Sequence, residues 1–170
     1  VETNSGRDRV NINGAYDALS GEVITINTQT INSSSTLKLF DAILKTNSNR
    51  DLYCFSDNAR YYKSNIIQEA LKENRYRRIK MVFIPTYSPN LNPIERVWKF
   101  FKKEVIENQF YKTFKEFKEG VDDFFQKRIK TEEMKEKLKV FASDNFHIRH
   151  REKISLICQP ADFKYNYCGG

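Results

Sequence analysis

Two short, unbroken apolar runs constrain the fold of this 170-residue chain more than any other feature. The first run is Leu52–Phe55 and the second is Met81–Ile84. Apolar runs of this length without polar alternation are typical of strands that are covered on both faces, as in parallel sheets flanked by helices. A helical pattern lies between the two runs and another follows the second run. The sequence therefore predicts an α/β domain.

The residues before the first run predict a β-hairpin that leads into a helix. Arg9 to Tyr16 alternates between polar and apolar residues, and Glu22 to Thr28 is rich in β-branched residues. A Ser/Thr stretch at residues 33–36 offers N-caps for the helix that follows. Later apolar stripes predict helices that start near residue 93, at about 113–129 and at 132–141. This order predicts a mixed sheet with helices on both faces.

The length and composition bound the organisation of the chain. A chain of 170 residues with 39% hydrophobic residues is long enough for one domain with a substantial core. We expect that domain to span residues 1–150, with residues 151–170 as a C-terminal tail of uncertain structure. The chain opens without a Met, as a fragment of a longer protein would.

The charge balance is basic, with a net charge of +7 and a pI near 9.3. This balance indicates a polyanionic partner such as nucleic acid, although a basic surface also serves solubility alone. The three cysteines form no CxxC pair, which excludes the usual zinc-site pattern. No apolar run reaches the length of a membrane span, and no signal peptide is visible. We therefore expect a cytoplasmic protein without a membrane partner.

Two carboxylates stand where the predicted core elements meet. Asp57 follows the first apolar run, and Glu95 lies in the first turn of the helix after the second run. Ligands of open α/β sheets bind at the carboxyl ends of the strands, so both acids can converge on one point. Purely structural roles are also open: Asp57 suits an Asx-turn, and Glu95 has capping-box spacing from Asn92 if Pro93 is the first helical residue.

The same residues carry a resemblance to a known family. The segment Ser56–Arg60 reads SDNAR, and Ile84–Lys102 reads IPTYSPNLNPIERVWKFFK. Both are similar to acidic blocks of the DDE transposases, specifically the IS630 branch of the IS630/Tc1/mariner superfamily. The YSPNLNPIE block is the most specific part of the match. Arg9–Val23 and Phe141–Arg149 are similar to that branch as well, so the resemblance covers nearly the whole chain.

The resemblance implies a ribonuclease H-like fold and a metal-dependent activity on DNA. Asp57 and Glu95 would be catalytic carboxylates that bind Mg²⁺ or Mn²⁺, whose preferred ligands are oxygen atoms. The expected reactions are phosphodiester cleavage by water and strand transfer by a DNA 3′-hydroxyl. Enzymes of this kind act on transposon ends and target DNA, usually as homodimers. The first Asp of the family would precede Arg9, so we expect this chain to lack its first strand and to be a poor or inactive nuclease alone.

Basic residues near the two acids are candidates for contacts with the DNA backbone. Arg60 and Lys63 follow Asp57, although Arg60 has equal claim to be the partner of an acid. Three lysines share the helix of Glu95 and lie off its apolar stripe, and they are Lys99, Lys102 and Lys103. A rival interpretation is a degenerate, catalytically inactive module of the same fold that binds DNA or protein. A structure-selective nuclease of the same fold is a third interpretation.

Overall fold

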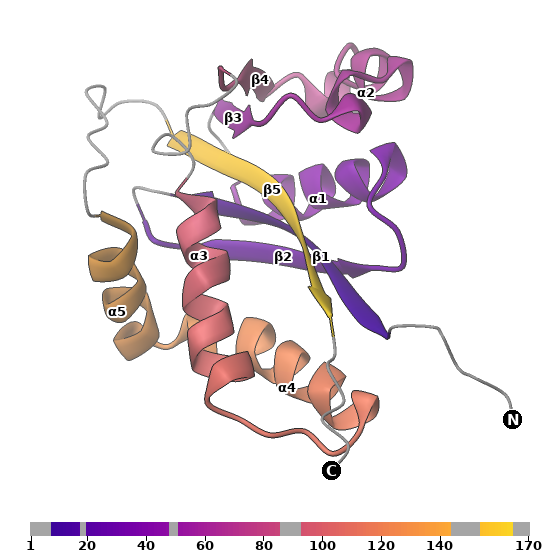
Figure 1. The fold of residues 1–170 in the computed structure, drawn as a ribbon. Helices are drawn as coiled ribbons and strands as arrows, with labels where there is room; N and C mark the ends of the chain where they lie inside the picture. Colours follow the sequence, from indigo (N-terminus) through magenta and orange to yellow (C-terminus); the bar gives the residue numbers. More distant parts are fainter. Residues whose placement is uncertain (1–7, 18–19, 48–50, 86–92, 144–153, 165–170) are drawn as a thin grey trace, which may run out of the picture.

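The computed structural model describes residues 8–17, 20–47, 51–85, 93–143 and 154–164. In this part of the chain, five strands form one mixed sheet (Figure 1). The predicted hairpin and both apolar runs are confirmed as strands. The strands are β1 (Arg9–Asp17), β2 (Val23–Thr28), β3 (Leu52–Ser56), β4 (Ile79–Phe83) and β5 (Ile154–Lys164).

The sheet has the order β2-β1-β5-β3-β4, so its middle strand is the last one in the sequence. β1 runs antiparallel to both β2 and β5. β3 runs parallel to both β4 and β5. The sheet therefore joins an antiparallel half to a parallel half, and β5 belongs to both.

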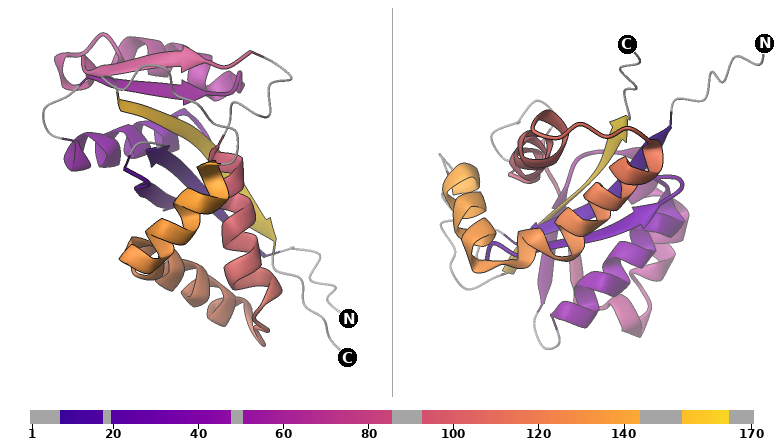
Figure 2. Two further views of the ribbon diagram at one scale, coloured as in Figure 1. Left: turned by 90° about the vertical axis from the view of Figure 1, so that its left-hand side faces the viewer. Right: turned by 90° about the horizontal axis from the view of Figure 1, so that it is seen from below.

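Helices cover both faces of the sheet, as the sequence predicts (Figure 2). One face carries α1 and α2, and the other carries α3, α4 and α5. Among the described residues, no helix has the length and apolar character needed to cross a bilayer. The helices are α1 (Ser33–Thr46), α2 (Asn65–Ala70), α3 (Ile94–Phe101), α4 (Phe114–Gln126) and α5 (Glu132–Ser143).

Shorter helical turns complete the described chain. A 3₁₀ turn, η1 (Arg60–Lys63), leads into α2, and a second, η2 (Asn74–Tyr76), leads into β4. A π-helical segment, η4 (Lys102–Glu107), continues α3. A further 3₁₀ turn, η5 (Arg128–Lys130), joins α4 to α5.

The core between the sheet and α3–α5 is aromatic. Alternate residues of β1 face it, including Val10, Ile12 and Tyr16, as period-2 alternation requires. Aromatic rings of α3 and β5 lie against them. The ring centroid of Phe163 is 6.0 Å from that of Trp98 and 4.5 Å from that of Phe101. These rings bury a large apolar area, and they hold α3 against β1 and β5.

The core on the opposite face is aliphatic and contains two cysteines. Cys54 of β3 and Cys158 of β5 are both free thiols and fully enclosed. A hydrogen bond with Cys54, together with burial, holds the pKa of the Cys158 thiol well above its ordinary value. The Cys158 thiol therefore stays neutral, and both cysteines are small core residues.

Two helix starts differ from the sequence prediction by one residue. α1 is capped by Asn32, whose side chain accepts a hydrogen bond from the Ser35 amide, and not by residues 33–36. α3 begins at Ile94, and Pro93 is its N-cap rather than its first helical residue. Asn92, the predicted N-cap, lies outside the described residues. Glu95 thus occupies the second helical position, which is one residue short of the capping-box spacing from Pro93.

The segment that the sequence leaves as a tail contains β5. Leu156, Ile157 and Cys158 are fully buried, and they complete the cores on both faces. The sheet therefore crosses the expected boundary at residue 150. The position that separates β1 from β3, where we expected a strand to be lacking, holds this C-terminal strand.

Candidate active site

Asp57 is the first residue after β3, at the carboxyl end of the parallel half of the sheet. The Ile84 amide donates to the Ser56 carbonyl at 2.9 Å, which ties the strand end to the chain beyond β4. Asp57 Oδ1 accepts a hydrogen bond from the Ala59 amide at 3.0 Å. Asp57 thus forms the Asx-turn that the sequence allows. The turn uses one carboxylate oxygen, Oδ1, and leaves the other for further ligands.

The carboxylate of Asp57 lies beside two tyrosines of the turn that follows. Burial, and then the charge of Asp57, raise the pKa of the Tyr61 hydroxyl. Burial also raises the pKa of Tyr62, whose hydroxyl has no hydrogen-bond partner among the described residues. Both tyrosines are therefore neutral at physiological pH and add no second negative charge beside Asp57.

Glu95 stands in the first turn of α3 and is half-buried. Each residue of a helix advances about 100° around its axis, so Glu95 flanks the buried stripe on the same side as Trp98. In the described part of the chain, neither Glu95 nor Asp57 has an ion-pair partner. Both carboxylates are therefore open to an external cation.

The contact between Trp98 and β1 fixes α3 beside the end of β3. A Cβ atom added to Gly14 would lie 2.6 Å from Trp98 Cη2, so the indole fits only because residue 14 is glycine. Gly14 pairs with Gln159 of the central strand, whose other neighbour is β3. Glu95 precedes Trp98 by about one helical turn and lies in the first turn of α3. The N-terminal end of α3 lies nearer to β3 and β4 than its C-terminal end does (Figure 1).

A hard divalent cation fits the chemistry of these two carboxylates. Both supply oxygen donors, and both are partly exposed, so water can complete the coordination sphere of Mg²⁺. Within the described ranges, no cluster of three or more His, Cys, Asp or Glu side chains is placed to hold a metal. The oxygen donors of Asp57 and of Glu95, taken one by one, are of the kind that Mg²⁺ and Mn²⁺ prefer.

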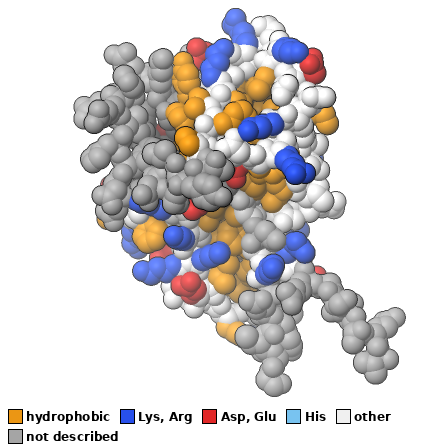
Figure 3. Space-filling model, turned by 45° about the horizontal axis from the view of Figure 1, so that its top comes forward, with side chains coloured by type: hydrophobic (Ala, Val, Ile, Leu, Met, Phe, Trp, Pro, Cys, Tyr) orange, Lys and Arg blue, Asp and Glu red, His pale blue; other side chains and the backbone are white. Residues whose placement is uncertain are grey.

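Lys63 and Arg60 lie on the turn beside Asp57. Lys63 Nζ donates to Asn58 Oδ1 at 2.6 Å, and it lies 4.9 Å from the centre of the Phe83 ring. Arg60 is exposed and has no ion-pair partner among the described acids, which leaves its guanidinium available to a phosphate. On the face shown in Figure 3, Lys and Arg side chains stand among hydrophobic ones, an arrangement that suits nucleic acid.

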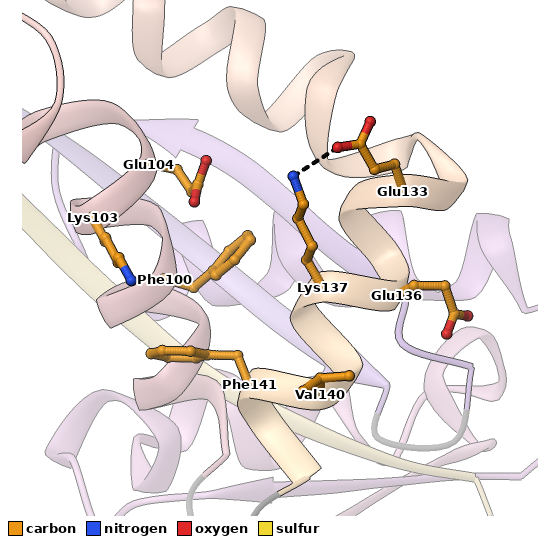
Figure 4. A pocket seen from close by; sticks show the side chains of 8 residues that line it. All are labelled: Phe100, Lys103, Glu104, Glu133, Glu136, Lys137, Val140 and Phe141. Carbon is orange, nitrogen blue, oxygen red and sulfur yellow. Dashed lines mark hydrogen bonds and ion pairs between the residues drawn. The ribbon is translucent and has the colours of Figure 1, made fainter.

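The three lysines near Glu95 do not share one environment. Lys99 and Lys102 are exposed. Lys103 lines a groove of about 660 Å³ between α3 and α5 (Figure 4). The groove is lined by Phe100, Lys103, Glu104, Glu133, Glu136, Lys137, Val140 and Phe141. Each acid of this groove pairs with a cation: Glu104 with Arg128, Glu133 with Lys137 and Glu136 with Lys139. Lys103 is exposed, as Lys99 and Lys102 are, and differs from them in bordering this groove.

Gly14 and Trp98 are positioning residues that sequence reasoning did not identify as a pair. The available signal was a glycine inside a strand with regular alternation, which often marks a close approach by another element. Trp98 belongs to the apolar stripe of the helix that the sequence predicts from about residue 93, and it is buried in the core beneath α3. Arg75 and Arg78, from the basic cluster before β4, are held by Asp41 and by the Asn47 carbonyl, at 2.6 Å in each case.

Comparison with known families agrees with this arrangement. The family model described as DDE superfamily endonuclease matches residues 1–118, which include both carboxylates and β1–β4. No curated protein and no solved structure matches the chain. The mixed sheet with helices on both faces is the ribonuclease H-like fold of these endonucleases. On the extent of this match, the chain belongs to the DDE superfamily of endonucleases.

Proposed function

We propose that this chain is the catalytic domain of an IS630-like DDE transposase. Its substrate is transposon-end and target DNA, and its reactions are phosphodiester cleavage and strand transfer. Asp57 and Glu95 are the proposed catalytic and metal-binding residues, with Mg²⁺ or Mn²⁺ as the cofactor. The bound cation would supply charge stabilisation to the phosphate oxygens and lower the pKa of a water molecule.

The availability of the two carboxylates carries this proposal. Two observations support this proposal. The strand registers place the end of β3 two strands away from β1, and the Gly14–Trp98 contact holds the helix of Glu95 against β1. Neither takes part in an ion pair with a described residue. An acid with a structural role alone commonly ends in a cap or a salt bridge. Among the bonds that join described residues, Asp57 has one such bond, from the Ala59 amide, and Glu95 has no ion pair.

DNA would approach along the turn after β3. Arg60 and Lys63 are the proposed phosphate contacts closest in sequence to Asp57, and Lys99 and Lys102 extend the basic surface along α3. Lys103 belongs to the same proposal. The net charge of +7 favours association with duplex DNA of any sequence. We place the protein in the cytoplasm, where it would act as a homodimer on paired ends.

The alternative is a catalytically inactive module of the same fold that binds DNA. The specific observation in its favour is the lack, in the described ranges, of a third acidic or histidine side chain near the two carboxylates. Two carboxylates hold a divalent cation less tightly than three, because the number of charged ligands tunes the affinity of such sites. Cleavage by this chain alone is therefore expected to be slow.

The test measures Mn²⁺ binding by electron paramagnetic resonance, and nicking of duplex DNA in the same samples. We expect Asp57→Asn and Glu95→Gln each to weaken Mn²⁺ binding by about tenfold or more, because each removes a charged ligand. Asp51→Asn, at the exposed opposite end of β3, is the matched control and leaves binding unchanged. Equal Mn²⁺ affinity in all four proteins would refute the site. If the two variants lose Mn²⁺ binding but the unmodified chain does not nick DNA, the result would favour the inactive module.

A further inference from the structure

Phe83 stands at the carboxyl end of β4, beside the strand that leads to Asp57. In the described part of the chain, β4 is an edge strand of the sheet and β3 is its neighbour (Figure 1). The register pairs Phe83 with Ser56, the residue before Asp57. Paired strands are about 5 Å apart and adjacent Cα atoms about 3.8 Å, so the Cα atoms of Phe83 and Asp57 lie within about 9 Å of each other.

The ring of Phe83 is exposed, although the same strand begins in the core. Ile79, at the start of β4, is 4% exposed, and Phe83 is 39% exposed. Residues of a strand that are an even number apart share a face, and Ile79 belongs to the core beneath α1 and α2. Phe83 therefore lies on that face at the point where the core ends, beside the strand end that carries Asp57.

Lys63 is held over this ring by the residue that follows Asp57. Lys63 Nζ lies 4.9 Å from the centre of the Phe83 ring and donates a hydrogen bond of 2.6 Å to Asn58 Oδ1. The Asn58 amide group donates in turn to the Ile84 carbonyl at 2.8 Å. One side chain thus ties the cation to the strand end that carries the ring, so the ring and the cation are placed together before a ligand binds.

This combination of groups points to a nucleotide. A single exposed aromatic ring is ordinary on a protein surface. Here the ring carries a fixed cation, and a carboxylate that is open to a metal ion follows in the neighbouring strand. Proteins that bind single-stranded nucleic acid stack its bases on aromatic rings and contact its phosphates with cations. The bases of a duplex are already stacked on each other, so a protein ring selects a base that has left the duplex.

We propose that Phe83 and Lys63 form a subsite for an unpaired nucleotide, whose base stacks on the Phe83 ring and whose phosphate contacts Lys63. This inference rests on the proposed function, in which Asp57 acts on a DNA phosphate. Bases rise about 3.4 Å per nucleotide along a strand, so the ring takes a base within about three nucleotides of the phosphate at Asp57. The favoured substrate is then DNA whose strands separate close to the cleavage position.

The experiment compares duplexes that carry a short unpaired extension of normal nucleotides or of abasic nucleotides, which keep the phosphates and lack the bases. Fluorescence anisotropy on the full chain in EDTA measures both affinities and that of the blunt duplex. We expect the unmodified chain to bind the extension with bases about fivefold or more tightly than the abasic one, the effect of stacking one base. In Phe83→Ala the two extensions bind equally, and binding of the blunt duplex is unchanged.

Three further variants separate stacking from other effects of the substitution. Phe110→Ala removes another exposed phenyl ring and is the matched control, which keeps the preference. Phe83→Trp retains an aromatic face and keeps the preference, whereas Phe83→Leu retains apolar bulk and loses it. Far-UV circular dichroism checks that each variant is folded. A full preference in folded Phe83→Ala or Phe83→Leu overturns the inference.

The outcomes distinguish this inference from the function on which it rests. If the unmodified chain binds the two extensions equally, yet binds blunt duplex and nicks it with Mn²⁺, the proposed function stands and the subsite is refuted. If the chain binds none of these DNAs, the proposed function fails and the subsite fails with it. An equal loss of preference in Phe110→Ala also overturns the inference, because the contact is then not specific to Phe83.

Discussion

Trp98 of α3 lies over Gly14 of β1 so closely that a Cβ atom at residue 14 would stand 2.6 Å from Trp98 Cη2. The contact joins the helix that carries Glu95 to the strand beside β5. Trp98 also meets the rings of Phe125 and Phe163 edge-on, with centroids 6.0 Å apart in both pairs. The indole is therefore fixed on several sides, and it cannot shift to admit a larger residue at position 14.

Gly14→Ala is expected to destabilise the protein by about 1–3 kcal/mol, the usual cost of overpacking a well-filled core. Urea unfolding followed by far-UV circular dichroism measures this change. In a Trp98→Phe background the smaller ring leaves room for the methyl group, so the same substitution should cost less. Equal costs in the two backgrounds would contradict the account of the contact, because a double-mutant cycle isolates direct coupling.

Leu156→Ala tests whether residues 154–164 form the central strand. Leu156 is fully buried between β1 and β3, so truncation should lower the free energy of unfolding by about 2–5 kcal/mol. Lys164→Ala, at the exposed end of the same strand, is the control and should change it by less than about 0.5 kcal/mol. If Leu156→Ala lowers the free energy of unfolding by less than about 1 kcal/mol, residues 154–164 do not form a core strand.

Tyr76 makes stability depend on pH in the alkaline range. Burial, and then the hydrogen bond to Asp41 at 2.8 Å, raise its pKa from 10.0 to about 12. Between these values the unfolded chain loses the tyrosine proton while the folded chain retains it, so unfolding becomes easier as pH rises. The stabilising contribution is complete below pH 10 and is lost as pH approaches 12.

The measurement for Tyr76 is the free energy of unfolding at several pH values in this range, for the unmodified chain and for Tyr76→Phe. The variant should show a shallower decline, because it has no proton to lose. Tyr16, whose pKa burial and Asp17 also raise to about 12, keeps part of the slope in both proteins. Identical slopes would argue against the Tyr76–Asp41 hydrogen bond.

Replacing Arg60 and Lys63 together with alanine should weaken binding to random duplex DNA. Each lost phosphate contact reduces the magnitude of the slope of log K against log salt by about 0.9. The slope of the double variant should therefore be smaller in magnitude by about 1.8 than that of the unmodified chain. Fluorescence anisotropy over a salt series measures both quantities. Lys115→Ala is the control, since Lys115 is exposed on α4 and faces Glu119 at 3.9 Å. An equal loss with Lys115→Ala would indicate a delocalised charge effect.

Local patterns were sufficient to predict most of the described fold. The alternation of Arg9 to Tyr16 and the two apolar runs identify strands, because burial on one or both faces dictates those patterns. The apolar stripes after residue 93 identify α3, α4 and α5. Strands and helices whose own residues carry a clear periodic or apolar pattern could thus be predicted from the sequence.

The place of β5 could not be predicted in this way. Pro160 stands in the middle of the strand, and a proline within an apolar segment argues against a central strand, because it cannot donate a ladder hydrogen bond. Moreover, β5 lies between β1 and β3, from which more than 90 residues separate it. No local pattern specifies so distant a pairing.

The acids at positions 57 and 95 were predicted from their places next to core elements, but their surroundings were not. The hydrogen bond from the Ala59 amide shows that a turn role and a free oxygen coexist at Asp57. At Glu95 the helix starts one residue later than the sequence suggests. Such boundaries depend on tertiary contacts more than on the local sequence.

The most direct test of the central claim is a crystal structure after a soak with Mn²⁺, with anomalous scattering used to locate the ion. The account predicts a peak within bonding distance of both the Asp57 and Glu95 carboxylates. Carboxylates that point apart, with the Mn²⁺ peak elsewhere or without one, would contradict it. In that case Asp57 would serve its turn alone, and this chain would hold no metal site of its own.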